Sequence, residues 1–180
     1  MAGYRKLSRS ASQRKALLRS QVTQLLYYGK IVTTEAKAKE IRKIAESIIA
    51  LGVKECKNYD TVTVKSRVPQ KDKDGHNIKE VKDGKKVTVY DEVDREIKKD
   101  QPSRLHARRQ MQKTLYTVKE IPDDVVGRRK GTKTVDVASV VLDEIGPKYA
   151  DRETKGGYTR IVKIGQRQGD AAMQVLIELV

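Results

Sequence analysis

The sequence predicts an α+β domain in which three strands combine with several helices. Apolar residues recur at helical spacing in three segments, which indicates amphipathic helices. Residues 30–34, 158–164 and 173–180 are β-branched or alternate between apolar and polar residues, as strands do. The core must be aliphatic, because 37% of the 180 residues are hydrophobic but none is Phe or Trp.

The N-terminal segment combines a basic arm with a first helix. Residues 1–9 have little to bury, so they form either an extended arm that orders against an acidic partner or a frayed, solvated tail. Ser10 and Gln13 have the spacing of a capping box, and the helix that they begin runs to Gly29, a typical residue after a last helical turn. The arm and the helix start form one continuous basic patch, made of Arg5, Lys6, Arg9, Arg14, Lys15 and Arg19.

A second helix and a segment of different character follow the first strand. Thr33 or Thr34 can cap this helix, and we interpret its basic residues as a solvated helix surface. Residues 53–102 contain two alternating stretches and two Asp-Gly turn dipeptides, which predict a small β-meander. We expect this meander to be an insertion in a core domain of residues 10–52 and 103–180.

A third helix is predicted from Ser103 to about Tyr116, and it carries a basic cluster. The members of this cluster are Arg104, His106, Arg108 and Arg109. Pro122 and the glycines at 127 and 131 then predict an inserted basic loop over residues 117–134. The loop's basic residues, Arg128, Arg129 and Lys130, either bind RNA or stay solvated, and we favour RNA.

A fourth helix is predicted over residues 134–145, with Gly146 and Pro147 as its end. Further on, two glycines precede the strand at 158–164. Such a pair is often only a loop, but missing side chains also let a sugar-phosphate backbone approach the main chain closely. The candidate residues at this turn are Gly156, Gly157, Tyr158 and Arg160.

The net charge indicates a polyanionic partner. The chain has 39 Lys and Arg against 24 Asp and Glu, a formal charge of +15 with a pI near 9.8, and self-repulsion of this size opposes folding. Residues 1–30 alone carry seven basic residues and no acidic one. Few aromatic residues are present for stacking bases, so we expect electrostatic binding that recognises the shape of an RNA.

The sequence offers no set of groups for catalysis, a metal or a cofactor. His76 and His106 lack Cys, Asp or Glu at zinc-ligand spacing, and Cys56 lacks a dedicated base. Residues 127–134 do not have the spacing of a phosphate-binding loop. We therefore expect no enzyme, no cofactor and no small-molecule substrate.

Membrane association and secretion are not expected either. The longest apolar runs are far shorter than the roughly 20 residues needed to span a membrane. The single cysteine and the absence of a signal-like apolar stretch predict a cytoplasmic protein.

Two other functions stay open at this point. A nucleoid-type protein would bind DNA without sequence specificity, although the chain has no major-groove helix signature and no heptad seam. An enzyme that modifies or cleaves RNA could use His106 and its neighbouring arginines, but it would need a second acid or base.

Several motifs follow one another in an order that is not generic. They are GYRKLSR at 3–9, SQRKALLR at 12–19, TTEAKAKE at 33–40, LHARRQ at 105–110, DEIGPKY at 143–149, GGYTR at 156–160 and GD at 169–170. In this order they resemble the L17 family of bacterial large-subunit ribosomal proteins. The resemblance extends over about residues 3–52, 103–116 and 135–180, and so many ordered matches are more specific than any single motif.

The resemblance implies a structural constituent of the large (50S) ribosomal subunit that acts in translation. It implies binding to 23S rRNA through the basic patch of the arm and first helix, with neighbouring ribosomal proteins near the peptide-exit side as further partners. It also implies a three-stranded mixed sheet. The sequence departs from the family at Ser8, where glycine is common, and at residues 53–102 and 117–134, where typical members run continuously.

Overall fold

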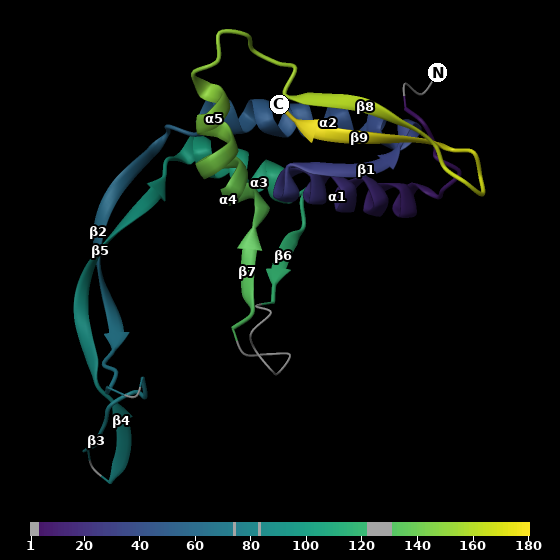
Figure 1. The fold of residues 1–180 in the computed structure, drawn as a ribbon. Helices are drawn as coiled ribbons and strands as arrows, with labels where there is room; N and C mark the ends of the chain where they lie inside the picture. Colours follow the sequence, from purple (N-terminus) through teal and green to yellow (C-terminus); the bar gives the residue numbers. More distant parts are fainter. Residues whose placement is uncertain (1–3, 74, 83, 122–130) are drawn as a thin grey trace. The chain divides into compact units, whose positions relative to one another are not determined.

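The computed structural model describes residues 4–73, 75–82, 84–121 and 131–180 (Figure 1). It divides the chain into two compact units, unit 1 with residues 1–58 and 102–180, and unit 2 with residues 59–101. Helices and small sheets together confirm the α+β class. The helical elements of unit 1 are α1 (Ala11–Tyr28), α2 (Glu35–Glu55), α3 (Pro102–Gln112), α4 (Val137–Val140), the π-helical turn η1 (Val141–Ile145) and α5 (Gly146–Ala150). Its strands are β1 (Lys30–Thr34), β6 (Thr117–Glu120), β7 (Lys133–Asp136), β8 (Thr159–Gln166) and β9 (Met173–Leu179).

Helix α1 begins and ends where the sequence predicts. The Ser10 hydroxyl accepts a hydrogen bond from the Gln13 amide, and the Gln13 side chain accepts one from the Ser10 amide, which completes the capping box. Gly29 has φ +77°, and its N–H donates to the carbonyl of Leu25 at 2.9 Å. Glycine adopts this left-handed conformation without a steric penalty, so both helix-end predictions are confirmed.

The main sheet has three strands in the order β1-β9-β8, and β9 pairs with both neighbours in the antiparallel direction. The three predicted strands are confirmed, but the prediction of a mixed sheet is wrong. Strands β8 and β9 follow each other through a short connection, which allows only an antiparallel pair. Val175 and Ile177 of β9 are fully buried and direct one face of the sheet toward the core.

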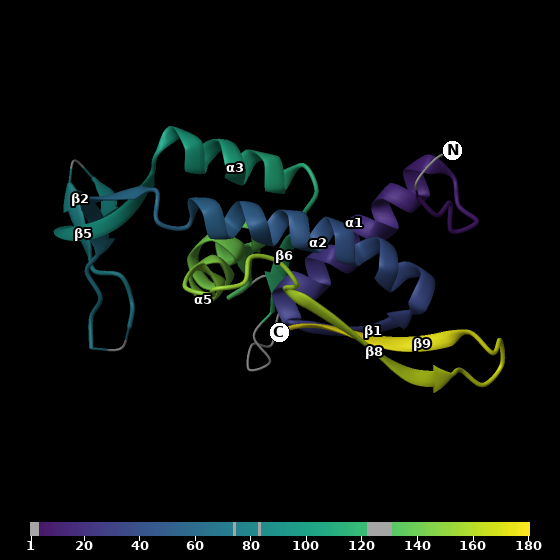
Figure 2. The same ribbon diagram turned by 90° about the horizontal axis from the view of Figure 1, so that it is seen from above.

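Helix α2 lies at the centre of the core and crosses α1 (Figure 2). Ala38, Ile41, Ala45 and Ile48 recur at helical spacing and are buried, as predicted, and Ile49 is buried as well. They pack with buried side chains of α1, β9 and the helical segment 137–150. The core is aliphatic apart from the buried tyrosines Tyr149 and Tyr158, whose ring centroids lie 5.2 Å apart.

Gly146 and Pro147 do not end the fourth helix, contrary to the sequence prediction. The helical path continues through η1, where the Gly146 N–H donates to the carbonyl of Val141, into α5. Pro147 stands in the first turn of α5, where a missing N–H is tolerated. Gly146 instead permits close packing against α2. A Cβ atom at Gly146 would lie 2.8 Å from the carbonyl oxygen of Gly52, and one at Gly52 would lie 2.7 Å from Cγ1 of Val141.

Residues 117–120 and 133–136 form a two-stranded antiparallel sheet, β6 with β7, in which Glu120 lies opposite Lys133. The predicted loop over 117–134 is therefore wrong for these residues. Helix α3 also ends earlier than predicted, at Gln112. The predicted RNA-binding residues Arg128, Arg129 and Lys130 lie outside the described residues.

Unit 2 consists of two antiparallel strand pairs, β2 (Tyr59–Pro69) with β5 (Tyr90–Asp100) and β3 (Lys79–Lys82) with β4 (Lys85–Thr88). The predicted strands are present, but the prediction of a β-meander is wrong, because β2 pairs with β5 and β3 pairs with β4 in two separate two-stranded sheets. Along β2 and β5, one face carries the exposed apolar residues Val62, Val64, Val93 and Ile97. The other face places Lys65 opposite Asp94 and Arg67 opposite Glu92.

Candidate nucleic-acid interface

The positive charge is concentrated in unit 1. Unit 2 contains 11 basic and 10 acidic residues, so unit 1 carries +14 of the formal charge of +15. A nearly neutral unit has little electrostatic attraction for a polyanion. A strongly basic unit attracts a polyanion over a distance that depends on the salt concentration. Unit 1 is therefore the candidate interface.

The basic arm is fastened to the domain by a buried carboxylate. The side chain of Glu40 on α2 is only 6% exposed, yet it accepts hydrogen bonds from the backbone amide of Arg5 at 3.2 Å, the guanidinium of Arg5 at 3.2 Å and the guanidinium of Arg14 at 3.0 Å. Burial by itself would raise the pKa of Glu40, but these donors outweigh it and hold the pKa below its ordinary value of 4.5. Arg14 also donates to the carbonyl of Arg5 at 2.7 Å and lies over the ring of Tyr4. We call this set the Glu40 clamp.

Beyond the clamp, the arm presents Lys6 and Arg9 to solvent. Ser8 has φ +51°, and Leu7 has φ +58°. Both values lie in the left-handed region that glycine adopts most easily. Ser8 therefore follows, with some strain, a backbone path that glycine would adopt freely, which agrees with the glycine expected at this position from the resemblance.

Arg14, Lys15 and Arg19 of α1 line one cavity together with residues that sequence reasoning did not select. We call this cavity the α1–α3 hollow. It has a volume of about 310 Å³, and its walls come from α1, α2 and the turn after α3. Its lining residues are Ala11, Arg14, Lys15, Leu18, Arg19, Ile44, Lys113 and Thr114.

A second cavity, of about 590 Å³, lies between the arm, α2 and β8, and we call it the α2–β8 groove. It is lined by Arg5, Glu35, Lys39, Arg42, Lys43, Glu46, Ile161 and Lys163. Some of the charges are paired within the groove, Lys39 with Glu35 at 2.7 Å and Arg42 with Glu46 at 3.1 Å. The hydrogen bond from Lys39 is the main reason why the pKa of Glu35 lies below its ordinary value. Five cations against two carboxylates leave the groove basic.

The structure separates the predicted basic cluster of α3. Arg104 is fully buried, and its guanidinium donates to the carboxylate of Asp143 at 2.8 Å, so it belongs to the core and not to the candidate interface. Arg108 is partly buried beside Ser139 and Asp136. His106, which bonds to Gln110 at 3.1 Å, and Arg109 are exposed on α3. Only these last two present themselves fully to solvent.

The four candidate residues at the double-glycine turn also differ in burial. Gly156 has φ +106° and Gly157 has φ +62°, and nothing lies within 4 Å of where their Cβ atoms would be. The main chain at both positions is therefore open to a close approach. Tyr158 is 4% exposed and packs in the core, which removes it from the candidate interface. Arg160 is exposed, and its Nε and Nη2 atoms both donate to Oε1 of Glu178, at 2.9 and 2.6 Å.

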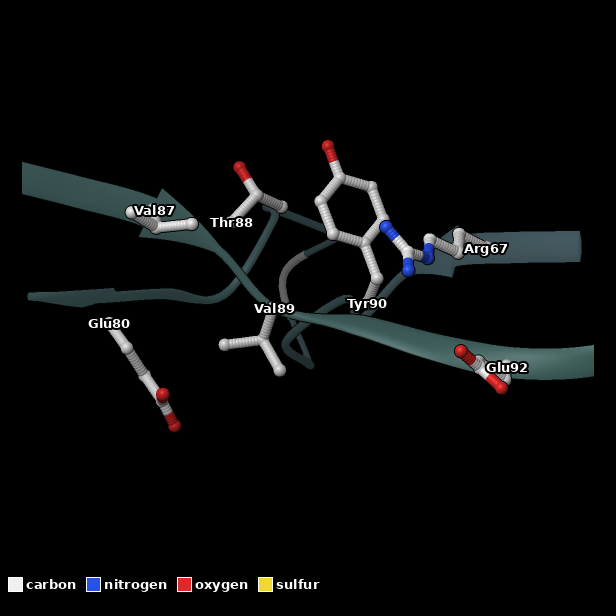
Figure 3. A pocket seen from close by; sticks show the side chains of 7 residues that line it. All are labelled: Arg67, Glu80, Val87, Thr88, Val89, Tyr90 and Glu92. Atoms are coloured by element: carbon white, nitrogen blue, oxygen red, sulfur yellow. The ribbon is translucent and has the colours of Figure 1, made fainter. Parts of the chain in front are cut away.

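A cavity of unit 2, shown in Figure 3, differs in charge from the α1–α3 hollow and from the α2–β8 groove. It has a volume of about 290 Å³, and its charged lining residues are Arg67, Glu80 and Glu92. The rest of its wall is Tyr90 with Val87, Thr88 and Val89. Two carboxylates against one cation do not favour a phosphate group, so this cavity is not part of the candidate interface.

The model of the family described as ribosomal protein L17 matches residues 17–180 of this chain. The chain belongs to the ribosomal protein L17 family. It is 65% identical over 180 residues to the large ribosomal subunit protein bL17 of Lachnospira eligens, with all of both chains covered. The bL17 proteins of Acetivibrio thermocellus and of Thermoanaerobacter sp. are 46% and 37% identical over 185 and 178 residues, with at least 99% of each chain covered.

Membership of the L17 family places the chain among ribosomal structural proteins and not among enzymes. Within the described residues, no group of His, Cys, Asp and Glu could hold a metal ion. The same part of the chain has no helix that is long and apolar enough to cross a membrane.

Sequence reasoning missed several basic residues of the candidate interface, because their positions depend on tertiary contacts. Lys113 follows the end of α3 and reaches the interface only because the turn after α3 packs on α1. Lys39, Lys43 and Lys163 meet only because α2 packs beside β8. The basic residues of α2 were interpreted as a solvated surface, and no local pattern distinguishes such a surface from one wall of a groove.

Proposed function

We propose that this chain is a structural constituent of the large ribosomal subunit, where it binds 23S rRNA and stabilises the folded RNA. The observation that carries the proposal is the whole-length similarity to large-subunit bL17 proteins. The placement of nearly all the net charge in unit 1 supports it, because binding to folded RNA depends first on neutralising phosphates.

In this proposal, the aliphatic core of unit 1 holds cationic groups in fixed positions on the RNA surface. The Glu40 clamp keeps the arm beside α1 and α2, so that Lys6 and Arg9 extend from an anchored segment. Arginine can contact a phosphate with two parallel hydrogen bonds, whereas lysine acts as a mobile point charge. The proposed RNA contacts are Arg5, Lys6, Arg9, Arg14, Lys15, Arg19, His106, Arg108, Arg109, Arg128, Arg129, Lys130, Gly156, Gly157 and Arg160.

Neighbouring large-subunit proteins, near the peptide-exit side, are the proposed protein partners. The nearly neutral charge and the exposed apolar face of β2 and β5 support an assignment of unit 2 to such contacts. We further propose that unit 2, residues 59–101, is an insertion in the core domain and that the protein acts in the cytoplasm. The bounds 53–102 expected from the sequence are too wide, because residues 53–55 belong to α2 and Pro102 begins α3.

Sedimentation of a cell lysate in sucrose gradients at low and high salt tests this function directly. We expect the protein to migrate with large subunits and to stay with them well above physiological salt. Its absence from the large-subunit fractions would contradict the proposal. The alternative, a DNA-binding protein of the nucleoid type, predicts equal affinity for duplex DNA and rRNA, which competition with unlabelled DNA measures.

A further inference from the structure

We propose that the α1–α3 hollow holds one unpaired nucleotide of the bound RNA, with the base on an aliphatic floor and the phosphate at a cationic rim. The inference rests on the proposed function and specifies which part of the RNA this cavity receives. It adds a site of defined shape to an interface that is otherwise described by its charge.

The floor of the hollow is apolar and is built from two helices. Leu18 of α1 is 3% exposed, and Ile44 of α2 is partly buried against the core, so both are held in place by packing. Ala11 leaves space on the solvent side of α1. A volume of about 310 Å³ is within the range of small-molecule sites, and it suits one nucleotide better than a base pair.

Two arginines form fixed walls of the hollow. The Arg19 guanidinium donates to the carbonyl oxygens of Thr114 at 3.2 Å and Leu115 at 3.0 Å, and it lies over the ring of Tyr116. Arg14 is held by the Glu40 clamp. Because their positions are already set, these guanidiniums lose little side-chain entropy when a ligand binds.

Two lysines at the rim are available for a phosphate. Lys15 and Lys113 are exposed, and within the described ranges neither ammonium group has a hydrogen bond or an ion pair. The lining holds four cations and no carboxylate, unlike the α2–β8 groove. This charge favours a nucleotide over the apolar side chain of a partner protein.

The shape indicates an unpaired nucleotide and not a duplex. In an A-form duplex the bases are stacked inside the helix, so an RNA duplex would offer this hollow only its phosphates and sugars. An extruded base instead brings an apolar face to Leu18 and Ile44 while its phosphate remains at the rim. Sequence-specific RNA recognition commonly uses such unstacked bases.

A pair of substitutions on α1 separates base insertion from electrostatics. Ala11→Leu fills part of the hollow without changing any charge, and Ala16→Leu adds the same side chain at an exposed position of α1 outside the hollow. The full-length variants are compared with the wild type in binding to large-subunit rRNA across a salt series. Chemical probing of unpaired nucleotides is carried out on the same complexes.

We expect the wild type and Ala16→Leu to protect a common unpaired nucleotide. Ala11→Leu should lose that protection and bind about tenfold more weakly, as for the loss of one base contact. Its slope of log affinity against log salt should stay the same, because all four cations remain.

Wild-type affinity and protections in Ala11→Leu would overturn the inference. Normal RNA binding by Ala11→Leu combined with its exclusion from assembled large subunits would also overturn it, because the occupant would then be a neighbouring protein. Failure of the proposed function is distinguishable, since the wild type itself would then not bind the RNA.

Discussion

The carboxylate of Glu40 on α2 receives a hydrogen bond from the guanidinium of Arg14 on α1 at 3.0 Å, and a second oxygen of the same group holds Arg5. An arm that carries a dense positive charge is thus anchored by an anion of its own domain. Sequence reasoning left open whether this arm is ordered or frayed without a partner. Anchoring at Arg5 reduces the entropy that RNA binding would otherwise cost, because fewer arm residues become ordered in the complex.

Replacement of Glu40 by Gln should weaken specific RNA binding although it makes the protein more positive. The neutral amide cannot hold two guanidiniums as strongly, so the arm loosens, and we expect affinity for large-subunit rRNA to fall by about tenfold. Affinity for duplex DNA, which reports the electrostatic contribution alone, should stay the same or rise. Glu153→Gln, at an exposed position of unit 1, makes the same change in charge away from the clamp. Equal gains in rRNA affinity for both variants would show that the clamp has no role in binding.

The clamp also predicts a pH dependence of the arm. Because the pKa of Glu40 is below 4.5 in the folded protein, the stability that the carboxylate contributes is fully present above about pH 4.5. It is lost as the pH falls through the lower folded-state pKa and the carboxyl group takes up a proton. In NMR spectra the backbone amide of Arg5 should shift with an apparent pKa below 4.5, and this titration should be absent in Glu40→Gln. A midpoint above 4.5 would contradict the assignment.

Arg104 and Arg109 are five residues apart, but the structure gives them opposite roles. Arg104→Ala removes a fully buried cation from its pair with Asp143, and we expect a loss of about 3 kcal/mol in the free energy of unfolding. Arg109→Ala should leave the urea midpoint unchanged. It should reduce the slope of log RNA affinity against log salt by about one, if this side chain contacts one phosphate. The reverse pattern would place Arg104 on the RNA.

Much of the fold follows from local signals in the sequence. The capping box at Ser10, the glycine at 29 and the alternation in the last two strands predict their elements, because each signal acts within one turn or one strand. The close packing of Gly146 against α2 could not be predicted in this way. It brings Gly146 next to Gly52, which is far away in the sequence.

The candidate interface shows the same division between local and tertiary information. Net charge identified the basic arm and the start of α1, but it could not show that Arg104 is buried or that Tyr158 is part of the core. A buried arginine and an exposed one have the same sequence signal when both lie on one short helix. Only the packing of α3 against the core decides between them, and the same packing brings Lys113 to the α1–α3 hollow.

Removal of unit 2 should preserve both the fold of unit 1 and its RNA binding. Every residue of the hydrophobic core cluster in the described parts of the chain lies in unit 1. Tyr59 and Asp100 are directly paired, so the chain leaves and re-enters unit 1 at neighbouring points, and a short Gly-Ser linker between Asn58 and Pro102 can close the gap. Since unit 2 has a charge of only +1, the slope of log rRNA affinity against log salt should change by less than the amount for one phosphate contact.

Circular dichroism, thermal unfolding and cosedimentation with large subunits measure the outcome, with a smaller deletion of residues 71–88 as the control. An unfolded product would show that unit 2 is integral to the domain, and a folded product that binds rRNA but no longer joins the subunit would show that unit 2 makes a protein contact needed for assembly.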